Sequence, residues 1–338
     1  MRNLLLISIS NNERVYRMKF VLLALLCLLA LAPAHADDGV DRARAYQAAL
    51  PLYTDTPHAP LHIVVSANKT FPDCRMTRFS YASVNTLRVP ALLFVPKSAS
   101  ATHPVPCIVV LHGLGGSKEL MAGFCRALAT AGYASLAIDL YGQGERALPA
   151  QRGAVSADQL QQNLVQSVTQ TTRDVRRALD YLDTRRDINP HRLGLAGLSL
   201  GAIIGTVASG VDTRLKATVL VSGGGGWGEI LRVLSARYAT YSGHAVTGRQ
   251  SLNWPLINIF LAPNDPLTFA PHIAPRALFM INGRQDATIP PARAEALYAA
   301  ALSAPHAHVR IDWLPQAGHL PPFDILFPAI RQWLHGAL

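Results

Sequence analysis

The sequence predicts an α/β fold, a mostly parallel sheet with helices on both faces, and three observations support this class. Hydrophobic residues make up 50% of the 338 residues and charged residues only 15%, a composition that favours a large buried core over disorder. From Pro104 onward, short continuous apolar runs alternate with segments whose apolar residues recur at helical spacing. Continuous apolar runs are typical of strands buried on both faces, as in parallel sheets. A chain that alternates such strands with helices covers both faces of its sheet.

The residues before this alternation are expected to add antiparallel strands. Residues 41–60 should hold a short helix and an irregular lead-in. Residues 75–81 alternate polar and apolar side chains, and residues 87–95 form an apolar run that contains a proline. Both segments are predicted to be antiparallel edge strands, because alternation indicates a half-buried strand and proline is tolerated at sheet edges.

The alternating part begins with the apolar run Cys107–Leu111, which is predicted to be a buried strand. A helix follows, and we expect Ser117 to cap its start and Gly132 to end it. Three apolar side chains at helical spacing should form the buried face of this helix: Leu120, Phe124 and Leu128.

The remaining elements follow the same rhythm, with one interruption. The predicted strands are residues 133–140, 193–196, 216–221, 277–281 and 309–314. The predicted helices are residues 171–184, 200–209, 291–302 and 323–334. Residues 223–276 are far longer than a usual crossover, begin with glycines and are rich in aromatic residues. We expect them to form a cap insertion over the strand ends, with a helix near residues 230–238.

The motif Gly197-Leu198-Ser199-Leu200-Gly201 joins a predicted strand to a predicted helix. A G-x-S-x-G match occurs by chance in about one chain in ten of this length. The position of the motif between a strand and a helix is therefore stronger evidence for a function than the match itself. A sharp strand-to-helix turn lifts the serine hydroxyl above the sheet and directs the helix N-terminus at it. The position therefore predicts a nucleophile elbow with Ser199 as the nucleophile.

The motif His112-Gly113-Leu114-Gly115-Gly116 directly follows the first buried strand. The tetrahedral intermediates of acyl transfer carry an oxyanion that needs two preorganised N–H donors. We expect the amides of Leu200 and Leu114 to be these donors. His112 is expected to orient this loop rather than to act as a base.

A serine nucleophile needs a base, and the base needs a carboxylate that orients it. Asp286 and His319 each follow a predicted strand by a few residues, and the carboxyl ends of parallel strands meet at one edge of the sheet. Their order after Ser199 fits a triad of Ser199, Asp286 and His319. The competitors are less well placed. Asp265 lies in a turn, Asp312 lies within a strand, and His306 and His308 precede the last strand.

On residues 104–118, 192–201, 276–290 and Gly318-His319, the sequence resembles the α/β-hydrolase superfamily. It is most similar to the dienelactone-hydrolase and acetyl-xylan-esterase-like branches. The resemblance covers most of the chain from about residue 70. It implies an eight-stranded sheet and serine hydrolysis without a cofactor or metal. Dienelactone hydrolases proper use a cysteine nucleophile, so Ser199 favours an esterase. The insertion departs from the smallest members of the superfamily, so no substrate can be transferred.

The predicted function is hydrolysis of a carboxylic ester through an acyl-enzyme on Ser199. A serine peptidase or amidase, or a thioesterase or acyltransferase, remains open on the same triad. A non-catalytic binding protein is disfavoured, because the triad and the oxyanion loop are all intact. The sequence does not fix the acyl group, the alcohol group or the oligomeric state.

The formal net charge of +10 is scattered along the chain. Because no run of five or six basic residues occurs and aromatic residues do not interleave with a basic stripe, nucleic-acid binding is not expected. A small-molecule or acylated substrate is the expected partner.

Residues 1–36 are expected to end in a cleavable signal peptide. Met18-Lys19 provides a short positive region, residues 21–31 are continuously apolar, and Ala34-His35-Ala36 is a small-x-small cleavage site. Met18 begins a complete signal, so we predict it to be the true start, with the hydrolase domain at residues 37–338. The apolar run is too short to span a membrane comfortably. A periplasmic or secreted location follows.

Export would permit a disulfide among the three cysteines beyond the signal, Cys74, Cys107 and Cys125. Cys74–Cys125 is the favoured pair, but three free buried thiols fit the sequence as well. The cysteines do not have the spacing of a metal site.

Overall fold

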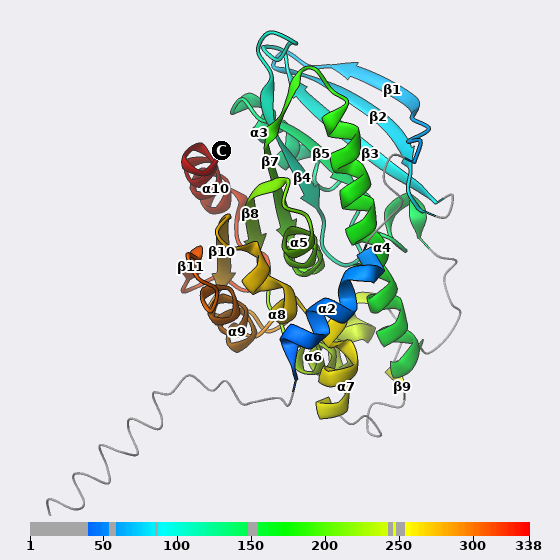
Figure 1. The fold of residues 1–338 in the computed structure, drawn as a ribbon, viewed down its shortest axis with the longest axis vertical. Coiled ribbons are helices and arrows are strands. Elements are labelled where there is room, and N and C mark those ends of the chain that lie inside the picture. Colours follow the sequence, from blue (N-terminus) through cyan, green and yellow to red (C-terminus); the bar gives the residue numbers. More distant parts are fainter. Residues whose placement is uncertain (1–39, 54–58, 85–86, 148–154, 243–245, 248–253) are drawn as a thin grey trace, which may run out of the picture. The chain divides into compact units, whose positions relative to one another are not determined.

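A nine-stranded sheet forms the centre of the structure, a computed structural model that describes residues 40–53, 59–84, 87–147, 155–242, 246–247 and 254–338 (Figure 1). The strand order is β1-β2-β3-β5-β4-β7-β8-β10-β11. The strands are β1 (Val64–Thr70), β2 (Cys74–Ala82), β3 (Arg88–Pro96), β4 (Val105–Leu111), β5 (Ala134–Ile138), β7 (Ile188–Leu198), β8 (Leu215–Val221), β10 (Ala277–Gly283) and β11 (His308–Leu314). The six strands from β5 to β11 are parallel, which confirms the mostly parallel α/β prediction.

The sheet has one strand more than the predicted eight, and the addition is β1. Strand β1 pairs antiparallel with β2 and forms the edge of the sheet. Neither β2, which lies between β1 and β3, nor β3, which lies between β2 and β5, is therefore the edge strand that was expected. Every residue of β1 is exposed. Because neither face of the strand is buried, its sequence carries no apolar alternation that could have indicated it.

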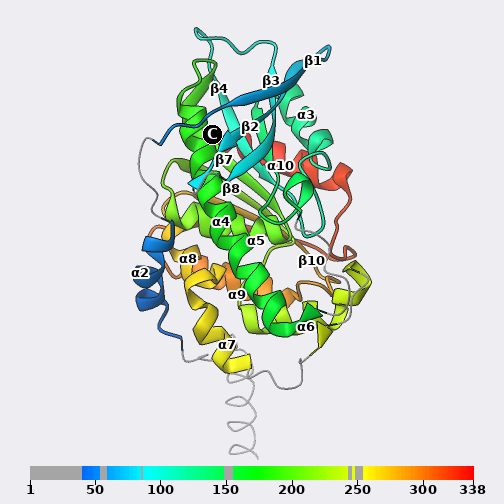
Figure 2. The same cartoon turned by 90° about the vertical axis from the view of Figure 1, so that its right-hand side faces the viewer.

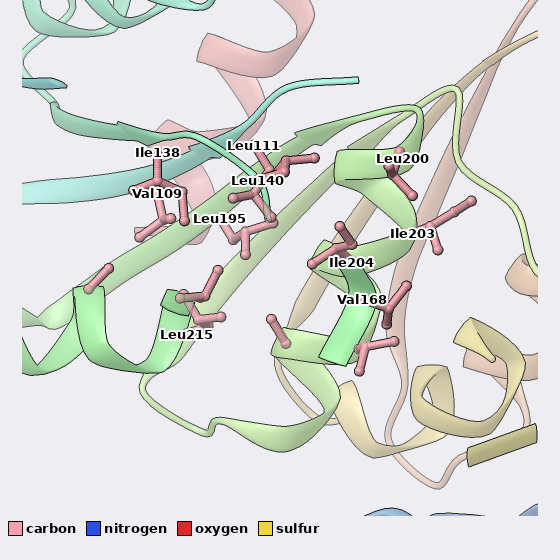
Figure 3. Close-up of a cluster of buried hydrophobic side chains, with 14 of the residues drawn as sticks. Val109, Leu111, Ile138, Leu140, Val168, Leu195, Leu200, Ile203, Ile204 and Leu215 are labelled. Atoms are coloured by element: carbon pink, nitrogen blue, oxygen red, sulfur yellow. The ribbon is translucent and has the colours of Figure 1, made fainter. Parts of the chain in front are cut away.

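Helices cover both faces of the parallel strands (Figure 1). They are α3 (Ala122–Thr130), α4 (Ala157–Asp183), α5 (Leu200–Val211), α9 (Pro291–Leu302) and α10 (Phe323–Ala337), and α2 (Arg42–Tyr53) packs outside them against α4. Alternate residues of β4 point to opposite faces. Val109 and Leu111 pack with α4 and α5 in the cluster of Figure 3, whereas Ile108 and Val110 pack with α3 and α10.

Two helix starts differ from the sequence prediction. Helix α3 begins at Ala122, and Ser117 does not cap it, because residues 117–121 form turns before the helix. The backbone and side chain of Lys118 are both bonded to the buried Asp139, which holds this segment out of the helix. Helix α4 begins at Ala157, well before the predicted residue 171, with Ser156 as its N-cap.

The insertion between β8 and β10 contains α6 (Trp227–Ser242), β9 (Val246–Thr247), α7 (Trp254–Leu261), η4 (Ala262–Asn264), α8 (Pro266–Phe269) and η5 (Ala270–Ile273). Figure 2 shows α6 and α7 side by side. The buried carboxylate of Asp265 accepts hydrogen bonds from the amides of Gly226, Trp227 and Leu267, so it ties the two ends of the segment together. That the insertion covers Ser199 stays a prediction. Strand β9 pairs with β6 (Val155–Ser156).

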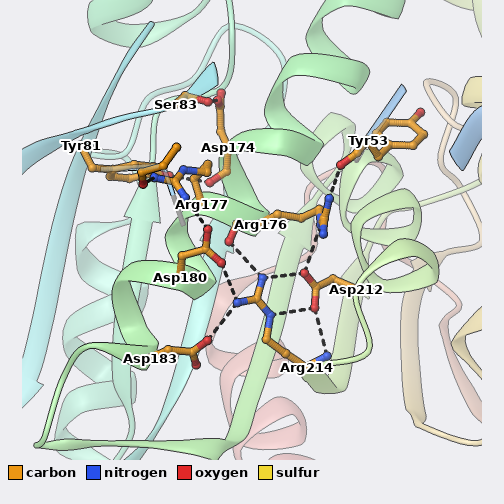
Figure 4. Close-up of polar contacts among 11 residues, drawn as sticks. Tyr53, Tyr81, Ser83, Asp174, Arg176, Arg177, Asp180, Asp183, Asp212 and Arg214 are labelled. Carbon is orange, nitrogen blue, oxygen red and sulfur yellow. Dashed lines mark hydrogen bonds and ion pairs between the residues drawn. The ribbon is translucent and has the colours of Figure 1, made fainter. Parts of the chain in front are cut away.

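An arginine–aspartate network fixes α4 against the start of β8 (Figure 4). Arg214 donates to both carboxylate oxygens of Asp212, and it also bonds Asp180 and Asp183 on α4. Burial alone would raise the pKa of Asp212, but the hydrogen bonds and charge of Arg214, with the charge of Arg176, lower it. The network therefore holds an ionised carboxylate at the end of α5.

The three cysteines of the described residues are free and buried, so the Cys74–Cys125 disulfide does not form. Burial raises the pKa of Cys125 to about 12, which keeps this thiol protonated. Among the described residues, no helix has both the length and the apolar character needed to cross a membrane. The signal peptide predicted at residues 1–36 lies outside the described residues.

Candidate active site

Ser199 occupies a strained turn between β7 and α5. Its backbone has φ of 55° and ψ of −114°, a region that residues other than glycine rarely adopt and that costs about 1–3 kcal/mol. The flanking glycines are required, because an added Cβ on Gly197 would overlap the backbone of Gly201, and one on Gly201 would overlap the backbone of Leu111. The local sequence thus produces the predicted elbow at the carboxyl edge of the sheet.

The structure brings Ser199, His319 and Asp286 into one hydrogen-bonded chain. His319 Nε2 lies 2.8 Å from Ser199 Oγ, and His319 Nδ1 lies 2.8 Å from Asp286 Oδ2. Asp286 follows β10 and His319 follows β11, so two neighbouring parallel strands deliver both side chains to the elbow. With Asp286 ionised, Nδ1 carries the proton and Nε2 is left to accept the Ser199 hydroxyl proton.

The carboxylate of Asp286 is buried and held on both oxygens. Oδ1 accepts hydrogen bonds from the amides of Thr288 and Ile289 at 2.8 and 2.9 Å, and Oδ2 faces His319. The loop that carries Asp286 packs directly against the loop that carries His319, since an added Cβ on Gly283 would overlap the backbone of Ala317. The two loops therefore position each other.

Ser222, at the end of β8, was not singled out from the sequence, yet it supports the histidine loop. Its hydroxyl donates to the carbonyl oxygen of His319 at 2.6 Å, and its own backbone has a φ of 53°. Its amide bonds the carbonyl of Ile281 on β10. The only sequence signal is its place directly after an apolar strand and before a run of glycines.

The loop of residues 112–116 lies against the nucleophile. A Cβ on Gly113 would stand 3.4 Å from the Cβ of Ser199. Within the described part of the chain, the amides of Leu114 and Leu200 have no acceptor, whereas their neighbour Gly115 donates to Gln143 Oε1 at 2.6 Å. Neither of the two amides predicted as oxyanion donors is therefore engaged in a hydrogen bond within the described residues, and their role in an oxyanion site stays a prediction.

His112 supports this loop from below. Its buried Nε2 accepts the amide of Leu140 at 3.2 Å, so Nδ1 carries the proton and donates to the carbonyl of Gly113 at 2.7 Å. Burial lowers the pKa of His112. Both nitrogens of the neutral ring are therefore used to hold the loop, and within the described residues the ring makes no hydrogen bond to Ser199.

A buried ion pair anchors the other end of the same loop, and sequence reasoning missed it. Lys118 Nζ lies 2.8 Å from Asp139 Oδ2 and also contacts Glu145. Burial would lower the pKa of Lys118, but its hydrogen bonds to Asp139, Glu145 and Glu119 outweigh burial and raise it. Asp139 and Glu145 follow β5, and β5 ends at the same edge of the sheet as the strand before the loop. This position was the sequence signal that could have indicated the ion pair.

The competing residues take other roles. Asp265 caps α8 and binds the insertion, and Asp312 pairs with Arg310 on β11. His308 begins β11, at the opposite end of that strand from His319, and His306 lies two residues before it. In the described residues, no group of three or more histidine, cysteine, aspartate or glutamate side chains could hold a metal ion.

Comparisons with known proteins identify the family and relatives of the chain. A model of the dienelactone hydrolase family matches residues 89–320. The putative hydrolase YtaP of Bacillus subtilis is 29% identical over 148 residues, which are 39% of this chain and 47% of that protein. The uncharacterized protein YcjY of Escherichia coli is 29% identical over 145 residues, which are 43% of this chain and 44% of that protein. The chain therefore spans less than half the length of these curated relatives.

Two solved structures share the fold over nearly their whole length. An acetyl xylan esterase from Paenibacillus sp. R4 superposes with a TM-score of 0.68 at 22% identity, covering 88% of this chain and 95% of the other. Acetyl xylan esterase 1 from a Thermoanaerobacterium species has a TM-score of 0.66 at 15% identity, covering 87% and 93%. At these identities the likeness concerns the fold.

Proposed function

This chain belongs to the dienelactone hydrolase family, and on that premise we propose that it hydrolyses carboxylic esters with Ser199 as the nucleophile. A lactone, the bond for which the family is named, is a cyclic carboxylic ester. The two structural relatives above are likewise named for ester cleavage, which supports an ester over an amide or a thioester.

In the first half of the proposed reaction, Ser199 Oγ attacks the ester carbonyl while His319 Nε2 takes the hydroxyl proton. Asp286 keeps the imidazole in the required tautomer and stabilises it once it is charged. The amides of Leu114 and Leu200 bind the oxyanion of the tetrahedral intermediate, and each such donor contributes about 3 kcal/mol. His319 then gives its proton to the departing alkoxide, and the acyl group remains on Ser199.

In the second half, water replaces the alcohol. His319 takes a proton from the water as it attacks the acyl-enzyme, and a second tetrahedral intermediate forms in the same oxyanion site. Its collapse breaks the bond to Ser199, returns the proton to Oγ and releases the carboxylic acid. The observation that carries this proposal is the unbroken hydrogen-bond chain from Asp286 through His319 to Ser199.

Labelling with a small fluorophosphonate tests the nucleophile. We expect the reagent to add to the peptide that contains Ser199, and Ser199→Ala to stay unlabelled by mass spectrometry. Ser303→Ala is the matched control, because Ser303 is exposed at the end of α9 and should not matter. Labelling of Ser199→Ala at the wild-type rate would refute the assignment.

The bond type is tested with an ester, a thioester and an anilide that share one acyl group. The ester should react faster than the anilide by a factor on the order of 100 or more, because the anilide nitrogen is a poorer leaving group than the alkoxide oxygen of the ester. A preference for the anilide would instead assign a peptidase or amidase, and a preference for the thioester a thioesterase.

A further inference from the structure

An apolar pocket of about 110 Å³ lies at the carboxyl ends of β4, β7 and β8, between the sheet and helices α3 and α10. Helix α3 contributes Phe124 and its N-cap Met121, and α10 contributes Phe323, Leu326 and Ile330. All the residues that line the pocket are apolar or glycine. The side chains that line the pocket therefore provide no hydrogen-bond or ion-pair partner for a charged or hydroxylated group, and burying such a group there would be unfavourable.

The pocket adjoins the nucleophile. Leu198, the residue before Ser199, lines its wall, and so does Gly197. A Cβ on Gly113 would lie 3.9 Å from Leu198 Cγ and 3.4 Å from Ser199 Cβ, so the oxyanion loop, the pocket wall and the nucleophile meet at one point. A substituent of an ester whose carbonyl is bound at Ser199 can therefore extend into the pocket.

The size of the pocket limits its occupant. An apolar cavity of about 150 Å³ holds benzene, which has six carbons. By the same proportion a pocket of about 110 Å³ holds about four. The half-exposed ring of Phe323 belongs to the lining and packs in a cluster with Phe124 and Phe327. These rings give one wall of the pocket a fixed shape.

We propose that this pocket binds an unbranched or singly branched apolar chain of about four carbons on the ester substrate. This inference rests on the proposed function. It goes beyond it by naming a substrate class, short-chain aliphatic esters, and the residues that select it. Acetyl groups leave the pocket mostly empty, and longer chains project from it into water.

Two ester series test the proposal and distinguish the acyl from the alkoxy side. One series varies the acyl chain of 4-nitrophenyl esters, and the other varies the alcohol chain of n-alkyl acetates. In one of them kcat/KM should rise about fourfold for each added methylene until about four carbons are bound, because each methylene that leaves water contributes this factor. The series that shows the rise identifies the substituent that occupies the pocket.

Variants of the wall should change this profile. Phe124→Ala enlarges the pocket and should move the optimum to chains at least two carbons longer. Leu326→Trp fills the pocket. It should reduce the ratio of kcat/KM for the four-carbon ester to kcat/KM for the one-carbon ester to about one. Met121→Trp fills the pocket from the opposite side, at the N-cap of α3, so it serves if Leu326→Trp does not fold.

The matched controls are two residues that do not line the pocket. Phe71→Ala removes a partly buried ring that stacks on Phe94 near the antiparallel edge, and Leu302→Trp enlarges an exposed side chain on α9. Both should keep the wild-type profile. A flat profile in both series, or wall variants that fold but leave the profile unchanged, would overturn the pocket proposal alone. Absence of both ester hydrolysis and Ser199 labelling would overturn the proposed function as well.

Discussion

At the scale of single residues, Ser199 and His319 lie 2.8 Å apart, and in the proposed mechanism they form one reacting unit, because the hydroxyl proton must reach Nε2 as Oγ attacks. We predict that Ser199→Ala and His319→Ala each lower kcat by a factor on the order of 10⁴ or more, and that the double variant is little worse than either. Steady-state kinetics on the best ester measures all three losses, with circular dichroism to check folding. Losses that multiply in the double variant would mean that the two residues act independently.

The protonation of His112, which supports the loop of residues 112–116, should make the stability of the protein depend on pH. Because burial lowers its pKa in the folded protein, the unfolded chain takes up a proton at a higher pH than the folded one. The stability that neutral His112 contributes is therefore present above its unfolded value, about 6.5, and is lost as pH falls below it.

We predict that wild type loses stability relative to His112→Gln below about pH 6.5, by up to about 1.4 kcal/mol per pH unit. Urea unfolding between pH 5 and 8 measures the difference. His191→Gln is the control, since His191 is exposed and donates through its amide to Asn189. If the two variants show the same pH dependence, His112 is not the group responsible.

At the scale of elements, the loop after β4 is held by the loop after β5, through the buried pair of Lys118 and Asp139. Removing one partner of a buried pair leaves an uncompensated charge, so Asp139→Asn should lower the free energy of unfolding by about 3 kcal/mol. It should also lower kcat, because Lys118 ends the loop that carries Leu114.

A double-mutant cycle isolates this pair. Lys118→Met combined with Asp139→Asn should recover part of the stability, because no unpaired ammonium remains buried. Urea unfolding supplies the four free energies. If the two effects are purely additive, the ion pair does not anchor the loop.

The elements that the sequence predicts well are those whose pattern reflects burial. The strands β4, β8 and β10 and the second half of β7 are largely apolar and buried because both faces are covered, and helix α9 was predicted with its observed bounds. Strand β1 carries no such pattern because it is exposed throughout. Helix α3 starts later than expected because a partner distant in sequence, Asp139, competes for the residues before it.

The same distinction applies to the candidate site. Ser199, Asp286 and His319 could be predicted because each follows a strand within a few residues, and parallel strands deliver their ends to one edge. Ser222 and Gln143 could not, because their contribution is a contact between loops whose separation the sequence does not reveal.

At the scale of the whole molecule, the prediction that remains concerns export. We propose that the mature protein begins at Asp37 and acts in the periplasm or outside the cell, because Ala34-His35-Ala36 follows an apolar run. N-terminal sequencing of the protein recovered from the exported fraction should read from Asp37. Recovery of a chain that starts at Met18 would contradict cleavage.

The unusual backbone of Ser199 has a consequence for the durability of the entire protein. Glycine adopts such a conformation readily, so Ser199→Gly should relieve the turn and make the inactive protein more stable, by about 1 kcal/mol and a few degrees in Tm. Differential scanning calorimetry would detect this, and a Tm at or below that of wild type would contradict it. A gain in Tm would mean that selection for catalytic activity keeps the protein less stable than its fold allows. A heat-resistant and active form would then need substitutions at positions remote from the Ser199 turn.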